Sequence, residues 1–442
     1  MSEVELPQGW VKAKVGDYLY LKNGFAFKSN AYVDKTESTY PVIRISDIDG
    51  MYASDKDAVH VSTPMAGFEV SEGDLLIAMS GATTGKVGVY KGISPAFQNQ
   101  RVGNLKLHSD KLGCRAYRNY LITALSGDIL KVAYGGAQPN ISGKAIEDMD
   151  IQLPPLAEQQ VIADKLDTLL AQVESIKSRL ERIPEILKQF RQSVLAAAVS
   201  DQESDVKALL DVADKITDGE HITPKTVEIG VPLLSAKDVQ EKELIFSSCK
   251  YLERNIADKA LARCNPRRND ILIVSRGATV GRTHLVSVDD EFCLMGSVLL
   301  IKLNKSLVHP QYMELVFKSL DGQRQLLAAS GSSAQQAIYI RDVKSFTFPL
   351  PSIETQSEVV ARVESWFSKA NAIEMSVQSA LDRVNNLTQS ILAKAFRGEL
   401  TAEWREANPE LISGENSAEA LLERIKAERS AKSVTKRGRG KA

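Results

Sequence analysis

The feature that most constrains the fold of this chain is an internal repeat, offset by about 197 residues. Three kinds of segment return: a strand followed by a glycine turn, a proline-containing junction, and the end of a helix. The pairs are Asp74–Ile77 with Asp270–Ile273, Leu153–Pro154 with Leu350–Pro351, and Gln192–Ala196 with Gln389–Ala393. Self-similarity at a near-constant offset indicates a tandem duplication of one structural unit. We expect a pseudo-twofold molecule, which suits ligands or partners that themselves come in pairs.

The chain has 442 residues, which is too long for one ordinary core and long enough for two or three domains. It contains no run of about 18 apolar residues, and its first residues are polar and acidic. We therefore expect neither a membrane span nor a secretory signal, and a cytoplasmic location. The four cysteines are scattered, with no CxxC pair, which favours reduced thiols over a disulfide or a zinc site.

Charge gives little indication of a nucleic-acid partner. The net charge is −1, and residues 1–150 and 205–350 are each within one charge of neutrality. A basic footprint over a whole domain is therefore absent. The C-terminal tail is the exception, because it holds eight cations against one acid, Glu428. The cations are Arg424, Lys426, Arg429, Lys432, Lys436, Arg437, Arg439 and Lys441.

Each repeat consists of a β-rich globular part followed by a long helix. The globular parts contain short β-branched runs separated by glycine, serine and asparagine clusters, with a few short helical stretches. This pattern predicts an α+β fold in tandem duplication. The predicted segments are a first globular domain at 1–153, a first helix at 154–200, a second globular domain at 201–350, a second helix at 351–398, and a C-terminal segment with the basic tail at 399–442.

The long helices show apolar residues at alternating steps of three and four, which is typical of a coiled coil. The predicted seam is Leu166, Leu169, Val173, Ile176, Leu180, Ile183, Leu187, Phe190 and Val194, repeated as Val363, Trp366, Ala370, Ile373, Val377, Ala380, Val384, Leu387 and Ile391. The alternative is an amphipathic helix lying on its own domain, but the narrow stripe with charged neighbours favours a helix–helix seam. Pro184 is expected to kink or break the first helix near Ile183.

Two such helices side by side would form a stiff spacer between the globular parts. The seam from residue 166 to residue 194 corresponds to about 42 Å of helix. That length is near the ~34–36 Å of one turn of DNA.

The turn from Gly81 to Lys86 invites comparison with a phosphate-binding P-loop. Only three residues separate its glycines where the motif needs four, and Val87 replaces the Ser or Thr that would hold magnesium. A tight turn after a strand is the better interpretation. Both copies end this turn in a cation, Lys86 and Arg282, which would suit a contact to a nucleic-acid phosphate.

A second pair of turns carries amide side chains, at residues 135–140 and 331–336. Asn and Gln can pair bidentately with adenine in the major groove. Gln138 and Gln335 are the strongest candidates because they occupy matching positions in the repeat. Polar loops that simply face solvent remain an alternative for any one of these residues.

The sequence offers no catalytic or metal-binding constellation. It has neither an Asn/Asp-Pro-Pro-aromatic methyltransferase motif nor a glycine-rich cofactor turn. The histidines have no spacing suited to a metal or a catalytic triad, and they are His60, His108, His221, His284 and His309. We therefore expect a non-catalytic chain.

The plan of domain, helix, domain and helix resembles the specificity subunit of a Type I restriction-modification enzyme. The resemblance runs over essentially the whole chain, and its best motifs are at the strand turn, the helix junction and the helix ends. These motifs are Gly-Asp-Leu-Leu-Ile (73–77), Leu-Pro-Pro-Leu-Ala-Glu-Gln-Gln (153–160), Gln-Ser-Val-Leu-Ala-Ala-Ala (192–198) and Gln-Ser-Ile-Leu-Ala-Lys-Ala-Phe-Arg-Gly-Glu-Leu (389–400). The stretch at 400–405 and the basic tail look like the enterobacterial Type IA subgroup. The second junction departs from the pattern, because it lacks the second proline and the glutamate before Gln356.

The resemblance implies that each globular part is a target-recognition domain that reads one half of a bipartite site on double-stranded DNA. The two helices would pair antiparallel and dock two methyltransferase subunits that use S-adenosylmethionine. Restriction subunits would complete a nuclease that depends on ATP and magnesium, so this chain itself would need no cofactor. The alternative is a coiled-coil scaffold that binds other proteins and reads no DNA.

The residues themselves, rather than the resemblance, supply the candidate DNA contacts. They are polar or basic side chains in or near the two turns of each copy. They are Ser80, Thr83, Thr84, Lys86, Arg101, Gln138 and Asn140, with Arg276, Thr279, Arg282, Ser333, Gln335 and Gln336. Substituting Lys86 and Arg282 by alanine is expected to weaken DNA binding and flatten its salt dependence.

Overall fold

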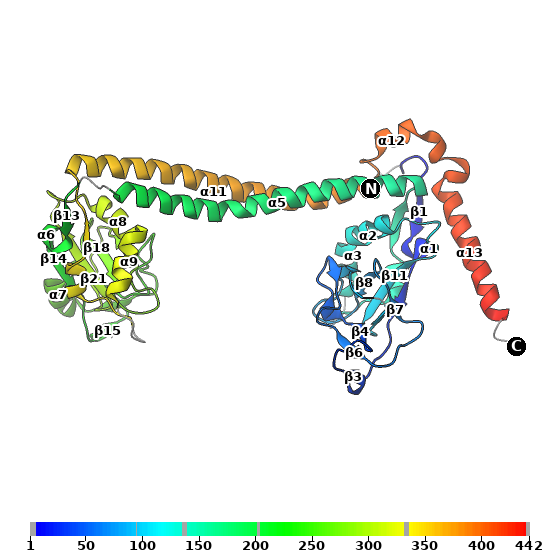
Figure 1. Ribbon diagram of the computed structural model, residues 1–442, viewed down its shortest axis with the longest axis horizontal. Coiled ribbons are helices and arrows are strands. Elements are labelled where there is room, and N and C mark those ends of the chain that lie inside the picture. Colours follow the sequence, from blue (N-terminus) through cyan, green and yellow to red (C-terminus); the bar gives the residue numbers. More distant parts are fainter. Residues whose placement is uncertain (1–5, 94, 135–138, 201–203, 331–335, 439–442) are drawn as a thin grey trace. The chain divides into compact units, whose positions relative to one another are not determined.

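The computed structural model describes residues 6–93, 95–134, 139–200, 204–330 and 336–438, with side chains in the last helix up to Lys432. The chain divides into two compact units, Met1–Ser178 with Leu381–Ala442, and Arg179–Ala380. Each unit holds one α+β domain and parts of both long helices (Figure 1). The α+β fold in tandem duplication is confirmed.

The domain of the first unit, called the first copy below, is built on two five-stranded sheets. One sheet has the order β2-β11-β8-β9-β5 and the other β3-β6-β4-β10-β7. The strands of the first are β2 Leu19–Asn23, β11 Val102–Leu107, β8 Leu75–Ala78, β9 Val87–Tyr90 and β5 Tyr52–Ala53. Those of the second are β3 Tyr32–Val33, β6 Val59–Val61, β4 Tyr40–Ile43, β10 Ala96–Gln98 and β7 Glu69–Val70. A separate antiparallel pair, β1 Val11–Lys14 with β12 Asp150–Leu153, brings the two ends of the copy together.

Short helices cover the first sheet of the first copy. They are α1 Val15–Tyr18, α2 Arg115–Ala124, α3 Ser126–Ala133 and α4 Gly143–Glu147. Inward side chains of the sheet, such as Leu75 and Leu105, share one core with buried residues of these helices, such as Tyr117 and Ile129. Burial of this apolar surface is the main source of stability, at about 25 cal/mol per Å².

The C-terminal segment belongs to this first unit. It contains α12 Ala402–Ala407 and α13 Ala418–Gly438. Leu421 and Ile425 of α13 are buried in the same core as the first copy. The N–H of Ala418 donates to the carbonyl of Gly9 at 3.1 Å. The part of the predicted basic tail that lies in α13 is therefore on a helix that packs against the first copy.

The domain of the second unit, called the second copy, repeats this plan with fewer strands. Its sheets have the orders β14-β21-β18-β19, β15-β17-β16-β20 and β13-β22. The strands are β13 Val206–Ala208, β14 Ala213–Asp218, β15 Thr226–Val227, β16 Val231–Leu234, β17 Lys250–Leu252, β18 Ile271–Val274, β19 Thr283–Leu285, β20 Cys293–Leu294, β21 Val298–Leu303 and β22 Thr347–Pro349. The helices are α6 Leu209–Val212, α7 Arg254–Arg263, α8 Pro310–Lys318, α9 Leu320–Ala329 and α10 Ile340–Lys344.

The long helices are α5 Leu156–Val199 and α11 Ile353–Phe396. In the first unit the start of α5 meets the end of α11, where Leu166 shares a core with Leu392. In the second unit the rings of Phe190 and Trp366 meet edge to face at 5.9 Å, so the end of α5 meets the start of α11. The two helices therefore pair antiparallel within each unit.

The predicted seam is narrower in the structure than in the sequence pattern. One set of positions, spaced seven apart, is buried or half-buried throughout: 166, 173, 180, 187 and 194, and 363, 370, 377, 384 and 391. Four residues of the other set remain 44–48 % exposed, and they are Ile176, Trp366, Ile373 and Leu387. A pair of helices buries only the stripe where they touch, so the second set lies at its flank.

Pro184 does not end α5, which is continuous from Leu156 to Val199. The alternative of a break at this point was wrong. Proline removes only one helical hydrogen bond, and the buried Leu187 one turn later keeps the helix against its neighbour.

All four cysteines are unpaired, as the sequence predicted. Burial raises the pKa of the Cys264 thiol to about 12 and that of Cys293 to about 11. Among the described helices, none is long and apolar enough to cross a membrane.

Candidate nucleic-acid interface

The first glycine-rich turn of the first copy lies beside Pro139 and Asn140, the last two residues of the second turn, although about 55 residues separate them. Ser80 and Asn140 form an isolated antiparallel bridge. The N–H of Gly81 donates to the carbonyl of Pro139 at 3.3 Å, and the hydroxyl of Thr84 reaches the same carbonyl at 3.2 Å. The first turn thus forms one continuous surface with the end of the second, at Pro139 and Asn140.

The second copy repeats this arrangement at the matching positions. Arg276 and Ala337 form the corresponding antiparallel bridge. The N–H of Ile338 donates to the carbonyl of Ser275 at 2.9 Å, as Ile141 does to Met79 in the first copy. Both copies therefore place the start of the first turn beside the chain at the end of the second, at residues 139–141 and 337–338.

The glycines of the first turn adopt a left-handed backbone conformation in both copies. Gly81 and Gly85 have φ of 85° and 84°, and Gly277 and Gly281 have φ of 99° and 85°. These left-handed values strain any residue with a side chain. The prediction of a tight turn after a strand is confirmed in both copies, and the turn follows β8 and β18.

The predicted contact residues separate into exposed and internal ones. Five lie on the surface, and they are Lys86, Arg101, Asn140, Arg276 and Gln336. Arg276 lies over the ring of Tyr339, with 6.0 Å from its guanidinium carbon to the ring centre. Gln138, Ser333 and Gln335 lie outside the described residues, so their contacts remain predictions.

The hydroxyl residues of the first turn point inward. Thr84 is 3 % exposed and donates to the carbonyl of Gly81 at 2.6 Å. Thr83 donates to the carbonyl of Ile45 at 3.2 Å, and the buried hydroxyl of Ser80 has no partner among the described residues. Thr83 and Thr84 hold the turn in shape, which leaves the neighbouring cations and amides as the groups best placed to reach a ligand.

The two matched cations have different surroundings. Lys86 is exposed and forms no ion pair with the described residues, and its charge helps to hold the pKa of Asp49 below the usual value, after the N–H groups of Tyr52 and Met51. Arg282 is half-buried and donates from Nη1 to Gln240 Oε1 at 2.8 Å and to the carbonyl of Val239 at 3.2 Å. Thr279 beside it is also half-buried. Lys86 is therefore available to bind a phosphate, whereas Arg282 already forms hydrogen bonds to the loop at Val239 and Gln240.

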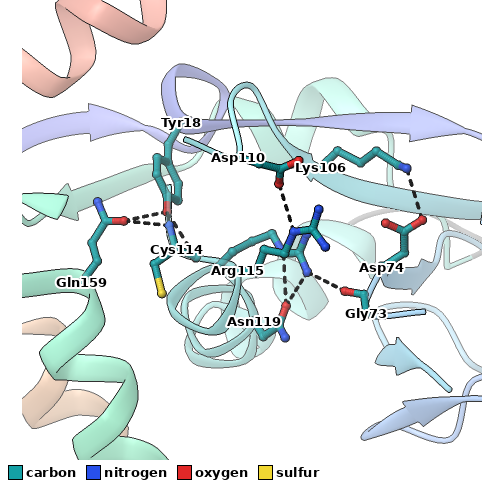
Figure 2. Close-up of polar contacts among 10 residues, drawn as sticks. Tyr18, Gly73, Asp74, Lys106, Asp110, Cys114, Arg115, Asn119 and Gln159 are labelled. Carbon is teal, nitrogen blue, oxygen red and sulfur yellow. Dashed lines mark hydrogen bonds and ion pairs between the residues drawn. The ribbon is translucent and has the colours of Figure 1, made fainter. Parts of the chain in front are cut away.

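A buried glutamine ties each copy to its long helix, a role that the sequence did not reveal. In the first copy Gln159 Oε1 accepts from the Tyr18 hydroxyl at 2.8 Å and from the N–H of Cys114 at 3.3 Å (Figure 2). Its amide donates to the carbonyl of Pro154 at 3.0 Å. Burial is the main reason why the pKa of Tyr18 is raised. The sequence did contain a sign of this role, because both copies carry a glutamine at this position.

Gln356 repeats this role in the second copy. Its Oε1 accepts from the N–H of His309 at 2.7 Å, at the start of α8. Its amide donates to the carbonyls of Pro351 and Leu307 at 2.8 and 3.0 Å. In both copies the first turn of a long helix thus caps a domain helix, which fixes the domain on its support.

The glutamate beside this glutamine is present only in the first copy, and the structure shows why. Glu158 is fully buried and accepts from Trp10 at 2.8 Å, from Thr401 at 2.5 Å and from Arg405 at 2.5 Å. Two of these partners belong to the C-terminal segment. Thr355 occupies the matching position in the second copy and is exposed. Thr355 instead bonds Ser352 in its own junction, so this position holds no contact to another segment among the described residues.

The described residues contain no group of three or more His, Cys, Asp or Glu side chains that could hold a metal ion. The surface around the turns instead carries exposed cations and amides. Such groups donate hydrogen bonds to phosphates and to base edges.

Comparison with known proteins identifies the class. The profile of the family described as the type I restriction modification DNA specificity domain matches residues 7–185 and 202–383. The chain belongs to this family of specificity proteins, whose role is the recognition of DNA sequence.

Particular relatives cover almost the whole chain. The EcoBI specificity subunit of Escherichia coli is 35 % identical, over 99 % of this chain and 96 % of its own length. The EcoKI specificity subunit of Escherichia coli K12 is also 35 % identical, over the full length of both chains. This likeness to enterobacterial subunits confirms the Type IA resemblance. The crystal structure of the HsdS subunit from Thermoanaerobacter tengcongensis has the same fold, with a TM-score of 0.64, 18 % identity, and coverage of 90 % of this chain and 99 % of that one.

Proposed function

We propose that this chain is the non-catalytic subunit that reads a bipartite DNA sequence for a Type I restriction-modification complex. Each copy would read one half of the target through its pair of turns. The observation that carries the proposal is the repetition of this surface in both copies with different exposed side chains. Lys86, Arg101 and Asn140 differ from Arg276 and Gln336 in type and placement, which suits two different half-sites.

We also propose that the paired long helices dock two methyltransferase subunits. The exposed apolar residues at the flank of the seam support this role. A stripe of this kind on a helix pair is suited to further helices that complete a bundle. The methyltransferase subunits would supply S-adenosylmethionine chemistry, and restriction subunits would supply cleavage that depends on ATP and magnesium. In this arrangement the chain itself directs where both reactions occur.

The near-neutral charge of the chain agrees with a reader that works inside a larger complex. Non-specific affinity for DNA comes mainly from neutralised phosphates and falls steeply with salt. A subunit whose partners surround the duplex does not need to supply those contacts alone. We therefore expect modest affinity for DNA from the isolated chain and higher affinity from the complex with its methyltransferase.

The test is selection of DNA by the chain in complex with its methyltransferase partner. A randomised duplex library is bound, recovered and sequenced, and affinity for the selected duplex is compared with that for a scrambled one. We expect two conserved blocks separated by a spacer of fixed length, and a preference of at least ~10³-fold for the selected duplex. Equal affinity for both duplexes would favour a protein scaffold that reads no DNA.

Matched variants sharpen this test by separating the half-sites. Asn140→Ala is expected to relax preference in one block only, and Gln336→Ala in the other, each by about 1–3 kcal/mol. The same selection experiment measures both. Loss of preference in the same block for both variants would contradict one half-site for each copy.

A further inference from the structure

A polar cavity lies on the first copy beside α13, away from the residues assigned to DNA reading above. Its volume is about 560 Å³, within the range of sites that hold small ligands. It is formed by the end of β11, the start of α2 and the middle of α13. The lining residues that matter here are Asp74, Lys106, Asp110, Lys111, Arg115, Arg118, Glu428 and Lys432.

The charges in this cavity do not cancel. Each of the three carboxylates has a cation beside it: Lys106 lies 3.2 Å from Asp74, Arg115 lies 3.0 Å from Asp110, and Lys432 lies 3.6 Å from Glu428. Figure 2 shows the first two of these pairs. Lys111 and Arg118 remain, and neither has a carboxylate of the described residues within 4.0 Å, although Asp74 and Asp110 act on Arg118 at longer range. The cavity therefore has two positive charges in excess.

Arg118 is the unusual member because it is only 2 % exposed. Its Nε and Nη2 donate to Asn119 Oδ1 at 3.1 and 2.8 Å, and Nη2 also donates to the carbonyl of Gly73 at 3.0 Å. Neither acceptor is charged, and Nη1 donates to none of the described residues. Burial lowers the pKa of Arg118, although an arginine at this position stays protonated at neutral pH. The carboxylates of Asp74 and Asp110 act on Arg118 at longer range, but each is paired directly with another cation. The buried charge is therefore only partly compensated, which is costly for the fold.

The second copy shows that the fold does not require this arginine. Tyr312 matches Tyr117, and the N–H of His309 matches that of Cys114 in bonding the buried glutamine. Both matches assign Met313 to the position of Arg118, and Met313 is fully buried among apolar residues. The ion pair of Lys106 with Asp74 does recur, as Lys302 with Asp270 at 2.5 Å. The buried arginine is therefore a feature of the first copy, as is Arg115, whose position in the second copy holds Pro310.

We propose that this cavity binds a phosphate group through Arg118 and Lys111. The guanidinium fork suits phosphate oxygens, and a charge-assisted hydrogen bond would use the unpaired Nη1. Lys432 reaches the cavity from α13, where it also donates to the carbonyl of His108 at 3.2 Å, so the C-terminal helix forms one wall. The phosphate comes either from a free phosphate compound or from the DNA backbone.

The experiment is isothermal titration of the full chain with inorganic pyrophosphate. Arg118→Met installs the residue that the second copy has, and we expect pyrophosphate affinity to fall at least tenfold. Lys35→Met removes one exposed positive charge elsewhere in the first copy, and it should leave the affinity unchanged. Equal affinity of Arg118→Met and the unaltered chain would overturn the proposal, as would absence of binding of both pyrophosphate and DNA at this cavity.

A second variant keeps the test independent of folding. Lys111 is exposed and forms no hydrogen bond or ion pair with the described residues, so Lys111→Met should not disturb the fold. We expect it to weaken pyrophosphate binding about threefold. If Arg118→Met does not fold, unchanged pyrophosphate affinity of Lys111→Met would overturn the proposal.

Titration with a duplex at several salt concentrations distinguishes the two sources of phosphate. If Arg118→Met weakens duplex binding and lowers the salt slope by about 1, the DNA backbone is the ligand. If it weakens only pyrophosphate binding, a free phosphate compound is the ligand, and either result supports a phosphate site. Sequence preference should be unchanged in both cases, so this experiment succeeds or fails separately from the proposed half-site reading.

Discussion

The first and second copies share the residues that attach a domain to its helix and differ in the residues that surround this attachment. Gln159 and Gln356 each accept from the N–H of the residue that precedes a domain helix, and each donates to the carbonyl of a proline before its own helix. One residue earlier, Glu158 is buried in bonds to the C-terminal segment, whereas Thr355 is exposed. The duplicated fold thus keeps the glutamine that attaches each domain to its helix. It changes the neighbouring residue, which bonds a segment that only the first unit contains.

The largest difference in stability between the two copies is expected when Glu158 is replaced. Glu158→Ala would leave Arg405 buried without its partner, and we expect a loss of about 3–5 kcal/mol from the first copy. Hydrogen exchange followed by mass spectrometry measures each copy separately. Thr355→Ala is the matched control and should change exchange in the second copy by less than about 0.5 kcal/mol. Equal effects of both variants would contradict the asymmetry.

The buried glutamines should instead behave alike. Gln159→Leu leaves the N–H of Cys114, the hydroxyl of Tyr18 and one carbonyl without this partner, and Gln356→Leu leaves the N–H of His309 and two carbonyls without it. Each copy should therefore lose about 2–3 kcal/mol. The same exchange measurement applies, read on the peptides that start α2 and α8. A loss confined to one copy would show that the two attachments are not equivalent.

The matched cations are expected to differ in DNA binding. Lys86→Ala should reduce affinity a few-fold and lower the salt slope by about 1, because an exposed lysine loses one phosphate contact. Arg282→Ala should have the smaller effect on the salt slope, since one end of its guanidinium already bonds Gln240 and Val239. Fluorescence anisotropy of the complex at several salt concentrations measures both. Identical salt slopes for both variants would show that the bonds of Arg282 to its own loop do not reduce its contact with DNA.

The smallest expected effect concerns pH. Burial lowers the pKa of His108 in the first copy and of His284 in the second. The folded state therefore binds fewer protons than the unfolded state, and stability falls as pH drops below about 6.5 towards the folded pKa. His284→Gln should flatten this dependence for the second copy only, as seen by hydrogen exchange at pH 7.5 and 5.5. An unchanged slope would mean that carboxylates dominate the response.

The repeats and the helical periodicity in the sequence were sufficient to predict the duplicated plan and the long helices. They did not predict the contacts between segments that are distant in the sequence. The repeated glycines predicted the turns because positive φ is a local property that glycine alone tolerates. The proximity of Gly81 to Pro139 depends on sheet pairing, which no local pattern encodes. The seam was predicted from spacing alone, so its exposed flank at Trp366 was not foreseen.

The candidate DNA residues show the same limit. Lys86, Arg101 and Asn140 were chosen for their chemistry, and their exposure agrees with a role in binding. Thr84 was chosen on the same grounds, yet its hydroxyl is used inside the turn, because burial depends on tertiary packing. Arg118 was not chosen at all, since its charge is unremarkable until its burial is known.

The division of the chain has a consequence for its synthesis on the ribosome. The second unit is continuous, from residue 179 to residue 380. The first unit needs Leu421 and Ile425, which are made last, to complete a core that begins with Trp10. We therefore expect the first unit to complete its core after the second, although its domain is translated first.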